Sequence, residues 1–267
     1  MNDTLVQYFI YDFNSPLMIT FSPAGKTLSE KEVGEGKNSW GFDFFHNKRF
    51  NVISFNAITN KHWFLCDSIN EFILDLDGLL DVFPCRLGYG ASMGAFAVNH
   101  YASLLKIDRM LLFTPRSPSE DIQIQNLTHS KDSVWVFVDP FHRSDKKFVD
   151  DNFKECRLFF FYGVGHRVIE SLSSLKILPV IIKDFVEEKD ISNWYYSAIR
   201  KRRKISRYYS YMLRVLKKRK SKSFISSYRL AYIIMILSNP RITALDLLFK
   251  WNKSMRRLYK SIVKGGV

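Results

Sequence analysis

The sequence predicts an α/β fold: a mostly parallel sheet flanked by helices, followed by a basic helical extension. Short runs rich in β-branched and aromatic residues alternate with stretches of helical periodicity, which is the pattern of such a sheet. Several of the runs are almost continuously apolar, as expected of central parallel strands that are buried on both faces. The charge changes abruptly near residue 190, which indicates a second part with a different role.

The expected strands and helices follow from these patterns. Strands are predicted over residues 5–12, 17–21, 50–55, 109–113, 134–138 and 157–162, and another begins within residues 84–88 and leads to Ser92. A helix is predicted over residues 67–80, where apolar side chains recur at helical spacing, and a second over residues 93–105, which are small and apolar. Residues 1–190 therefore form one predicted domain, and residues 191–267 form a second, helical one.

Composition limits the class of protein. At 267 residues, 46% of them hydrophobic and 15% aromatic, the chain can bury a substantial core and is not disordered. Cys66, Cys85 and Cys156 are widely spaced, which excludes a disulfide framework or a zinc site and predicts core residues in a reducing compartment. No phosphate-binding glycine loop and no metal-ligand pattern is present, so we expect no cofactor.

The sequence also bears on location. The first residues lack the features of a secretory signal, and no apolar run approaches the length of a membrane-spanning helix. We therefore expect a cytoplasmic protein, with peripheral attachment to the inner membrane as a further expectation.

The strongest local motif is a GxSxG pentapeptide at residues 90–94, with Ser92 at its centre. A serine that leaves a strand and enters a helix within one residue occupies a strained turn, and its neighbours two positions away must be small. An apolar strand precedes this motif and a helix rich in alanine follows it. Ser92 is therefore the candidate nucleophile.

A serine hydroxyl needs a base to take its proton, and the candidate is His166. It follows the last predicted strand in the segment Tyr-Gly-Val-Gly-His, at a carboxyl end of the sheet, where open α/β sheets hold their sites. His142, near the expected acid loop, is the main rival. The other histidines, in polar loops or inside the helix after Ser92, are weaker candidates: His46, His62, His100 and His129.

The third group should be an acid that orients the imidazole, just beyond the strand over residues 134–138. Asp139 and Asp145 both qualify. We favour Asp139, which stands at the strand end, and interpret Asp145 as a structural cap of the next helix. Asp150 and Asp151 fall inside that helix and are weaker choices.

The order Ser92, then Asp139 or Asp145, then His166 resembles the α/β-hydrolase superfamily over about residues 5–185. The resemblance implies an oxyanion hole built from the backbone N–H of Met93 and from a second N–H, of Ser22 or Ala24, after an early strand. About twenty residues separate the strands at 109–113 and 134–138, which leaves little room for an apolar lid. Aromatic residues at 40–45 and 63–64 either line the pocket or belong to the core.

The charge is divided unequally along the chain. Residues 1–190 carry 20 basic and 25 acidic residues, whereas residues 191–267 carry 20 basic residues and one acid. Three uses of this basic, tyrosine-rich segment remain open: an anionic membrane surface, an acidic polymer, or a solvated appendage. We favour the membrane among the functional uses, because no recognised motif supports nucleic acid.

Together these features predict a serine esterase or O-acyltransferase that acts on an acyl ester. The segments GYGASMG and TFSPAG also resemble hydrolase-fold proteins of bacterial surface-polysaccharide synthesis, which implies an acylated glycan or glycolipid as substrate. The alternative from another class is a non-catalytic hydrolase-like scaffold that binds a membrane or anionic polymer through its basic tail.

Overall fold

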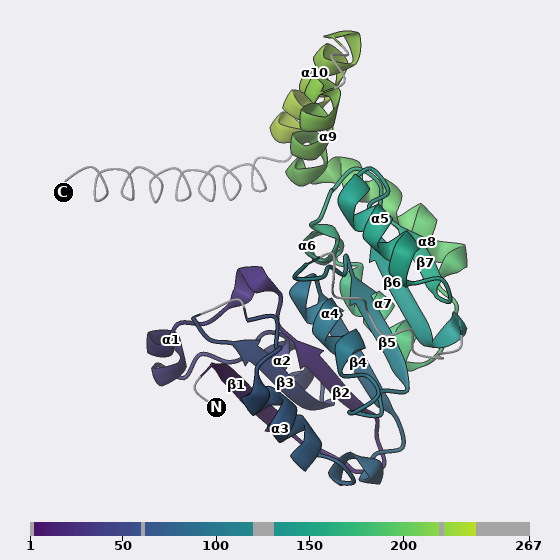
Figure 1. The fold of residues 1–267 in the computed structure, drawn as a ribbon. Coiled ribbons are helices and arrows are strands. Elements are labelled where there is room, and N and C mark those ends of the chain that lie inside the picture. The colour runs from purple at the N-terminus through teal and green to yellow at the C-terminus, as the bar shows by residue number, and fades with distance from the viewer. Residues whose placement is uncertain (1–2, 60–61, 120–130, 219–221, 239–267) are drawn as a thin grey trace, which may run out of the picture. The chain divides into compact units, whose positions relative to one another are not determined.

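The computed structural model describes residues 3–59, 62–119, 131–218 and 222–238 (Figure 1). The chain divides into two compact units, Met1–Ser192 and Asn193–Val267. The first unit contains the sheet and the helices that cover it. The described part of the second unit is helical.

The first unit is built on one seven-stranded sheet with the order β1-β3-β2-β4-β5-β6-β7. Every neighbouring pair is parallel except β1 and β3, which are antiparallel. This mostly parallel sheet confirms the predicted fold class. The strands are β1 Thr4–Phe9, β2 Leu17–Phe21, β3 Asn51–Ala57, β4 Arg86–Ala91, β5 Arg109–Phe113, β6 Val134–Val138 and β7 Arg157–Phe160.

Helices and 3₁₀ turns connect the strands. In the first unit they are η1 Ala24–Lys26, α1 Glu30–Gly34, α2 Phe42–His46, α3 Asp67–Asp75, η2 Leu79–Val82, α4 Met93–His100, η3 Lys131–Ser133, α5 Arg143–Asn152, α6 Val168–Ser174 and α7 Leu178–Val186. Two helices are shorter than predicted. The helix expected over residues 67–80 ends at Asp75, and Gly78, whose φ is 76°, leads into the separate turn η2. The helix after Ser92 ends at His100.

Alternation along β6 shows how both faces of the sheet are buried. Val134, Val136 and Val138 join the apolar cluster that also holds side chains of α3, α4 and α5. Trp135 and Phe137 point to the opposite face, where Trp135 contacts Phe185 of α7 with ring centroids 5.3 Å apart. Burial on both faces explains why the central strands read as nearly continuous apolar runs.

Aromatic rings pack side by side across the second face. Phe137 stacks on Phe113 of β5 at 5.0 Å and on Phe159 of β7 at 4.8 Å, and Phe113 contacts Tyr89 of β4 at 5.9 Å. Such cross-strand pairs stabilise a sheet by about 0.2–1 kcal/mol each. They hold the strand ends in register where β4, β5, β6 and β7 carry the residues described below.

The cysteines lie partly in this core. All three are thiols, and Cys156 is buried, whereas Cys66 and Cys85 are half-buried. Burial raises the pKa of the Cys85 thiol, although Arg109 opposes the shift. The expectation of three core cysteines therefore holds in full only for Cys156.

The second unit contains α8 Ser192–Ala198 (which starts at the boundary), η4 Ile199–Lys204, α9 Ser206–Lys218 and α10 Lys222–Ser238. Tyrosines join α9 to α10: the Tyr208 and Tyr228 hydroxyls lie 3.0 Å apart, and the Tyr209 and Tyr232 rings stack at 5.4 Å. None of the helices in the described ranges is both long and apolar enough to span a bilayer.

Candidate active site

Ser92 is the single residue between β4, which ends at Ala91, and α4, which begins at Met93. Its φ of 55° and ψ of −117° lie in a region that residues with side chains rarely adopt. Two backbone bonds hold it there: its N–H donates to the carbonyl of Phe113 (2.9 Å), and its carbonyl accepts from the N–H of Phe96 (3.2 Å). Strain of this kind costs about 1–3 kcal/mol and is concentrated at functional sites.

The two glycines of the motif are required by close packing. A Cβ atom on Gly94 would collide with the carbonyl oxygen of Phe21 in β2, and one on Gly90 would collide with the backbone of Gly94. Both collisions are with backbone atoms, which cannot move aside as a flexible side chain can. The sharp turn at Ser92 therefore depends on glycine at both positions.

His166 reaches the serine from the loop between β7 and α6. Its Nε2 lies 2.9 Å from Ser92 Oγ, although 74 positions separate the two residues in the chain. Gly163 and Gly165 have φ values of 86° and 65°, so the loop turns in a way that favours glycine. The sheet thus brings the predicted nucleophile and base together at one edge.

The acid that contacts His166 is Asp145, not the favoured Asp139. Asp145 Oδ2 lies 2.7 Å from His166 Nδ1. The interpretation of Asp145 as a helix cap is also wrong, because His142 occupies the N-cap position of α5 and Asp145 lies in the first helical turn, fully buried. That turn places its carboxylate beneath the imidazole.

Cationic and polar groups surround Asp145 on its other side. Arg116 donates from Nε to Asp145 Oδ1 at 2.7 Å, and His142 Nδ1 lies 3.1 Å from Oδ2. Burial raises the pKa of Asp145, but hydrogen bonds and charges from His142 and His166 outweigh it and hold the pKa well below its usual range. Asp145 is therefore a carboxylate at neutral pH.

The ionised carboxylate determines the tautomer of His166. Because a carboxylate only accepts hydrogen bonds, Nδ1 of His166 must carry the proton that it donates to Asp145. Nε2 is then the acceptor and lies within reach of the Ser92 hydroxyl proton. This is the protonation state that a general base requires.

Asp139 has a different set of partners. It is fully buried at the end of β6 and accepts backbone N–H groups from Phe141 (2.9 Å), Val164 (2.7 Å) and Gly165 (2.5 Å). Burial raises its pKa, and the backbone hydrogen bonds only partly oppose the shift. Its carboxylate is occupied by the loop that carries His166, so it positions that loop and does not contact the imidazole.

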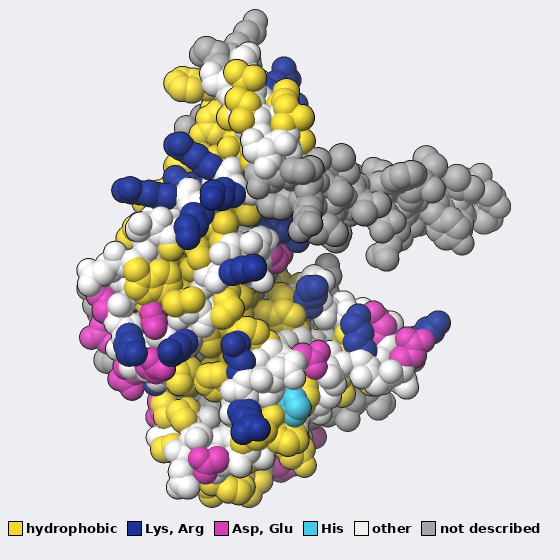
Figure 2. Space-filling model, turned by 180° about the vertical axis from the view of Figure 1, so that it is seen from behind, with side chains coloured by type: hydrophobic (Ala, Val, Ile, Leu, Met, Phe, Trp, Pro, Cys, Tyr) yellow, Lys and Arg dark blue, Asp and Glu magenta, His cyan; other side chains and the backbone are white. Residues whose placement is uncertain are grey.

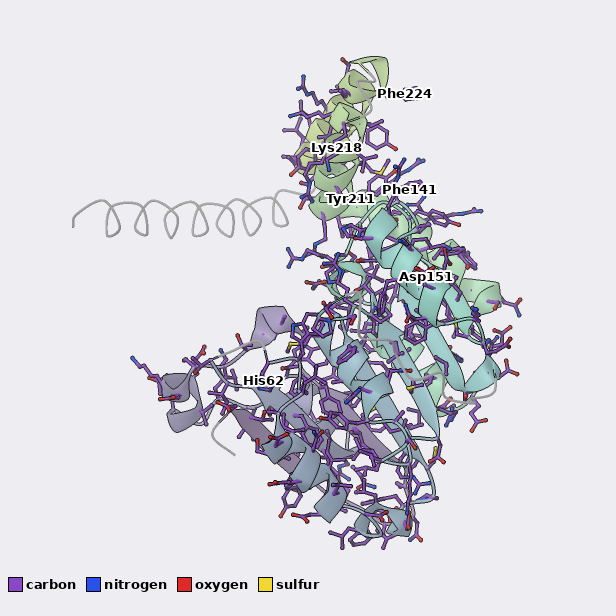
Figure 3. The ribbon with its side chains drawn as sticks, viewed as in Figure 1. His62, Phe141, Asp151, Tyr211, Lys218 and Phe224 are labelled. Atoms are coloured by element: carbon purple, nitrogen blue, oxygen red, sulfur yellow. The ribbon has the colours of Figure 1, made fainter. Side chains whose placement is uncertain are left out.

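The other histidines lie apart from Ser92. His142 is 6.0 Å from His166, measured between ring centroids, and contacts the acid and Ser144. His62, labelled in Figure 3 beyond β3, contacts the Asp3 carbonyl, and His100 stacks on Phe96. Burial lowers the pKa of His100. His46 packs among aromatic rings near β1, and His129 lies outside the described residues.

Two contributors to the site were not expected from the sequence. Arg116 was not singled out, and His142 was considered only as a rival base. The position of Arg116, just beyond the end of β5, is the signal that could have found it, because cations beyond neighbouring strand ends meet at the same edge of a parallel sheet.

The structure bears on one of the three expected oxyanion donors directly. The N–H of Ser22 donates to the carbonyl of Phe55 at 2.9 Å, so the expectation for Ser22 is wrong. Met93 and Ala24 are the first residues of α4 and η1, and the N–H of a first helical residue has no partner inside its helix. The close approach of Gly94 to Phe21 brings these two segments together.

The aromatic residues at 40–45 and 63–64 differ in burial, and none of them is shown to line a pocket at Ser92. Phe42, Phe45 and Phe64 are buried in the core. Trp40 and Phe44 line an open cleft between η1 and α2. The expected absence of a lid depends on the segment between β5 and β6, of which residues 120–130 lie outside the described residues.

We also searched the described residues for a metal-binding group of side chains. Within the described ranges, no three His, Cys, Asp or Glu side chains are grouped as metal ligands would be.

The chain is similar to several solved structures at low sequence identity. No family model and no curated protein matches the chain. Solved structures do match: a predicted hydrolase from Thermoplasma acidophilum (14% identity, 69% of this chain and 92% of that chain, TM-score 0.44) and a lidless serine hydrolase from Xanthomonas campestris (12%, 70% and 87%, 0.40). The capsule O-acetyltransferase of Neisseria meningitidis serogroup A also matches (11%, 70% and 92%, 0.46).

The seven-stranded, mostly parallel sheet with flanking helices is the predicted α/β fold class. The similar structures include hydrolases, carboxylesterases and an O-acetyltransferase.

Proposed function

We propose that the protein is a serine-dependent acyl-ester hydrolase or acyltransferase, with Ser92 as nucleophile, His166 as general base and Asp145 as the orienting acid. The observation that carries the proposal is the continuous hydrogen-bonded path from Ser92 Oγ through both ring nitrogens of His166 to Asp145. The buried, ionised carboxylate of Asp145 and the strained backbone of Ser92 support the same assignment of roles.

The reaction follows from this geometry. As Ser92 Oγ attacks the ester carbonyl, His166 Nε2 takes the hydroxyl proton, and Asp145 stabilises the imidazolium that forms. The N–H groups of Met93 and Ala24 stabilise the oxyanion of the tetrahedral intermediate. His166 then gives its proton to the departing alcohol, which leaves an acyl group on Ser92. Water or a second alcohol, deprotonated by His166, releases that acyl group.

Labelling with a fluorophosphonate tests the nucleophile. We expect the wild-type protein to react at Ser92 and the Ser92→Ala variant to remain unlabelled, because the probe needs an activated serine. Ser103→Ala, at an exposed position outside the site, is the matched control and should label like wild type. A folded wild-type protein that does not react would favour the non-catalytic scaffold.

The acyl acceptor decides between hydrolase and transferase. An acylated glycan or glycolipid is the substrate class that we propose. Release of the acyl group should accelerate when a sugar acceptor is added, with the acyl group recovered on the sugar. Release at the full rate without acceptor would show a hydrolase.

We also propose that the second unit binds an anionic membrane surface. Its residues carry almost exclusively basic charge. On α10, Leu230, Ile233, Ile234 and Leu237 recur on one helical face and are between 52% and 74% exposed. Figure 2 shows apolar side chains gathered over α9 and α10 with Lys and Arg beside them. An apolar stripe flanked by cations suits the surface of an anionic bilayer.

The stripe lies opposite the face of α10 that packs on α9. Tyr228 and Tyr232 make the contacts to α9, and both are about half a turn from Ile234 and Leu230 on the helix. Phe224, labelled in Figure 3 near the start of α10, is also exposed. The helical hairpin therefore leaves this apolar face unpaired within the described residues.

Vesicle sedimentation tests the membrane proposal. The full-length protein should sediment with vesicles containing phosphatidylglycerol and not with pure phosphatidylcholine, and binding should weaken as salt is raised. Ile234→Asp should reduce binding, whereas Ser238→Asp adds the same charge beside the stripe and should reduce it less. If the two variants lost vesicle binding equally, charge alone would determine binding.

A further inference from the structure

Thr114, the residue that follows β5, has a strained backbone in the interior of the protein. Its φ of 44° is left-handed, a conformation that β-branched residues seldom adopt because the branch at Cβ collides with the backbone. Pro115 comes next, and a residue before proline is pushed toward extended conformations. Thr114 is 1% exposed. Two steric effects oppose this turn, so contacts with neighbouring elements must hold it, as is common near functional sites.

The peptide group between Phe113 and Thr114 is bonded on both sides. Its carbonyl accepts from the N–H of Ser92 at 2.9 Å, and its N–H donates to the carbonyl of Phe137 at 2.8 Å. β5 lies between β4, which leads to Ser92, and β6, which contains Phe137 (Figure 1). The start of the turn therefore also fixes the backbone of the proposed nucleophile.

The side chain of Thr114 reaches the segment that carries the proposed base. Its hydroxyl donates to the backbone carbonyl of His166 at 3.2 Å. Just before that residue, Asp139 accepts the N–H groups of Val164 and Gly165. The main chain around His166 is therefore held on both sides. Because the imidazole extends from this main chain, its position depends on both contacts.

The same turn also leads to the acid. Arg116, two residues after Thr114, donates from Nε to Asp145 Oδ1 at 2.7 Å. Residues 113–116, which we call the β5 turn, therefore contact all three members of the proposed catalytic group. A backbone carbonyl of the turn contacts the nucleophile, a hydroxyl contacts the segment of the base, and a guanidinium contacts the acid. One short segment thus fixes groups that come from three other parts of the chain.

We infer that Thr114 is a positioning residue, whose hydroxyl holds the main chain of His166 where the imidazole Nε2 faces Ser92 Oγ. Glycine would adopt this backbone without strain but would carry no hydroxyl, so the strained threonine agrees with a role for its side chain. The inference rests on the proposed function for its effect on reaction rate. The position of the imidazole can be measured independently.

Two substitutions separate the hydroxyl from the branched shape of the side chain. Thr114→Val keeps the branch at Cβ and replaces the hydroxyl by a methyl group, whereas Thr114→Ser keeps the hydroxyl and removes the methyl group. Thr4→Val is the matched control. Thr4 is also buried, at 4% exposure, and its hydroxyl also makes a 3.2 Å contact, with His62 Nε2, but it lies on the edge strand β1. All variants are made in the full-length protein.

The rate of reaction at Ser92 is the first measurement. We expect Thr114→Val to lower both the rate constant of fluorophosphonate labelling and kcat for p-nitrophenyl acetate about fivefold, within the range that the loss of one hydrogen bond gives. KM should stay unchanged, because a side chain that is 1% exposed does not contact the substrate. Thr114→Ser and Thr4→Val should react like wild type. Equal losses in Thr114→Val and in either of these variants would overturn the inference.

The position of the imidazole is the second measurement. The proton on His166 Nδ1, bonded to the Asp145 carboxylate, should give a far-downfield NMR signal that is absent from His166→Gln. Thr114→Val should shift or broaden this signal, and Thr114→Ser should leave it in place. A purely structural role of the hydroxyl would lower the melting temperature and leave both the signal and the labelling rate unchanged, and that result would overturn the inference.

Thermal unfolding shows whether each variant is folded. Thr114→Val leaves the His166 carbonyl without this donor, so the melting temperature should fall, as it should in Thr4→Val. If Thr114→Val does not fold, Thr114→Ala and Thr114→Ser form a second pair that differs in the hydroxyl, and neither has a branch at Cβ. We then expect the slower labelling and the altered signal in Thr114→Ala.

The outcomes also separate this inference from the proposed function. If wild type labels at Ser92 and Thr114→Val labels equally fast with an unchanged signal, the role of Thr114 fails and the catalytic proposal stands. If wild type does not label, the catalytic proposal fails, and the NMR signal alone decides whether Thr114 positions His166.

Discussion

Asp139 and Asp145 follow the same strand, are both fully buried, and have opposite surroundings. Backbone N–H groups surround Asp139, whereas Arg116, His142 and His166 surround Asp145. Their pKa values accordingly move in opposite directions: burial raises that of Asp139, and for Asp145 the side-chain partners overcome burial and lower it.

The difference teaches what a buried carboxylate can do at the end of a strand. One that accepts several backbone N–H groups fixes the path of a loop, here the loop that carries His166. One that contacts titratable side chains influences their charge and can stabilise an imidazolium during a reaction. Proximity to the strand end, which favoured Asp139 in the sequence, does not distinguish Asp139 from Asp145. The groups that each carboxylate contacts do distinguish them.

The largest expected effect is on catalysis by Asp145→Asn. The amide cannot hold His166 in the tautomer that accepts the Ser92 proton, so kcat for an ester substrate should fall about 10⁴-fold. Steady-state kinetics measure the loss. Asp139→Asn is the matched control: it should retain far more activity, and a comparable loss in both variants would erase the distinction between them.

Asp139→Ala should mainly affect stability. Removing the carboxylate leaves the N–H groups of Phe141, Val164 and Gly165 without their acceptor, which should lower the free energy of unfolding by about 3 kcal/mol. Urea denaturation followed by circular dichroism measures this change. Phe141, labelled in Figure 3, lies in the segment between β6 and α5, and its side chain is exposed. Unchanged stability would contradict a loop-holding role.

Arg116→Gln should have a smaller catalytic effect. Arg116 contacts the acid and not the imidazole, so it is a positioning residue, and its loss should lower kcat about tenfold, equivalent to about 1.4 kcal/mol. Arg143→Gln is the control, because Arg143 is exposed and lies in the helix turn that contains Asp145; this variant should leave kcat unchanged.

The smallest expected effect is on the pH dependence of unfolding. Because the pKa of Asp145 is lowered by folding, its stabilising contribution is present above the unfolded value of about 3.9 and is lost as pH falls through the lower folded value. The pKa of Asp139 is raised, so its contribution is present below about 3.9 and is lost as pH rises through the folded value.

Urea titrations between pH 6 and pH 3 compare these contributions. Relative to wild type, Asp145→Asn should lose less stability on acidification, and Asp139→Asn should lose more. If both variants changed the dependence of the free energy of unfolding on pH in the same way, the environments of Asp139 and Asp145 would be equivalent.

The sequence by itself determined the sheet, the elbow and the pairing of Ser92 with His166. Apolar runs identify buried parallel strands, and β2, β5 and β6 have the predicted bounds. The two glycines identify the turn at Ser92, because the backbone contacts that require them are local to the motif and its neighbouring strand. These features depend on short stretches whose pattern is directly visible.

Only the tertiary structure decided which aspartate contacts His166, that the Ser22 N–H is already bonded, and that Arg116 contacts Asp145. Each depends on which partner a group meets across the sheet edge: the loop of Val164 and Gly165 occupies Asp139, and Phe55 occupies the Ser22 N–H. A hydrogen bond satisfied between distant segments leaves no periodicity in the chain, and so its effect on the site emerges only when the strands are assembled.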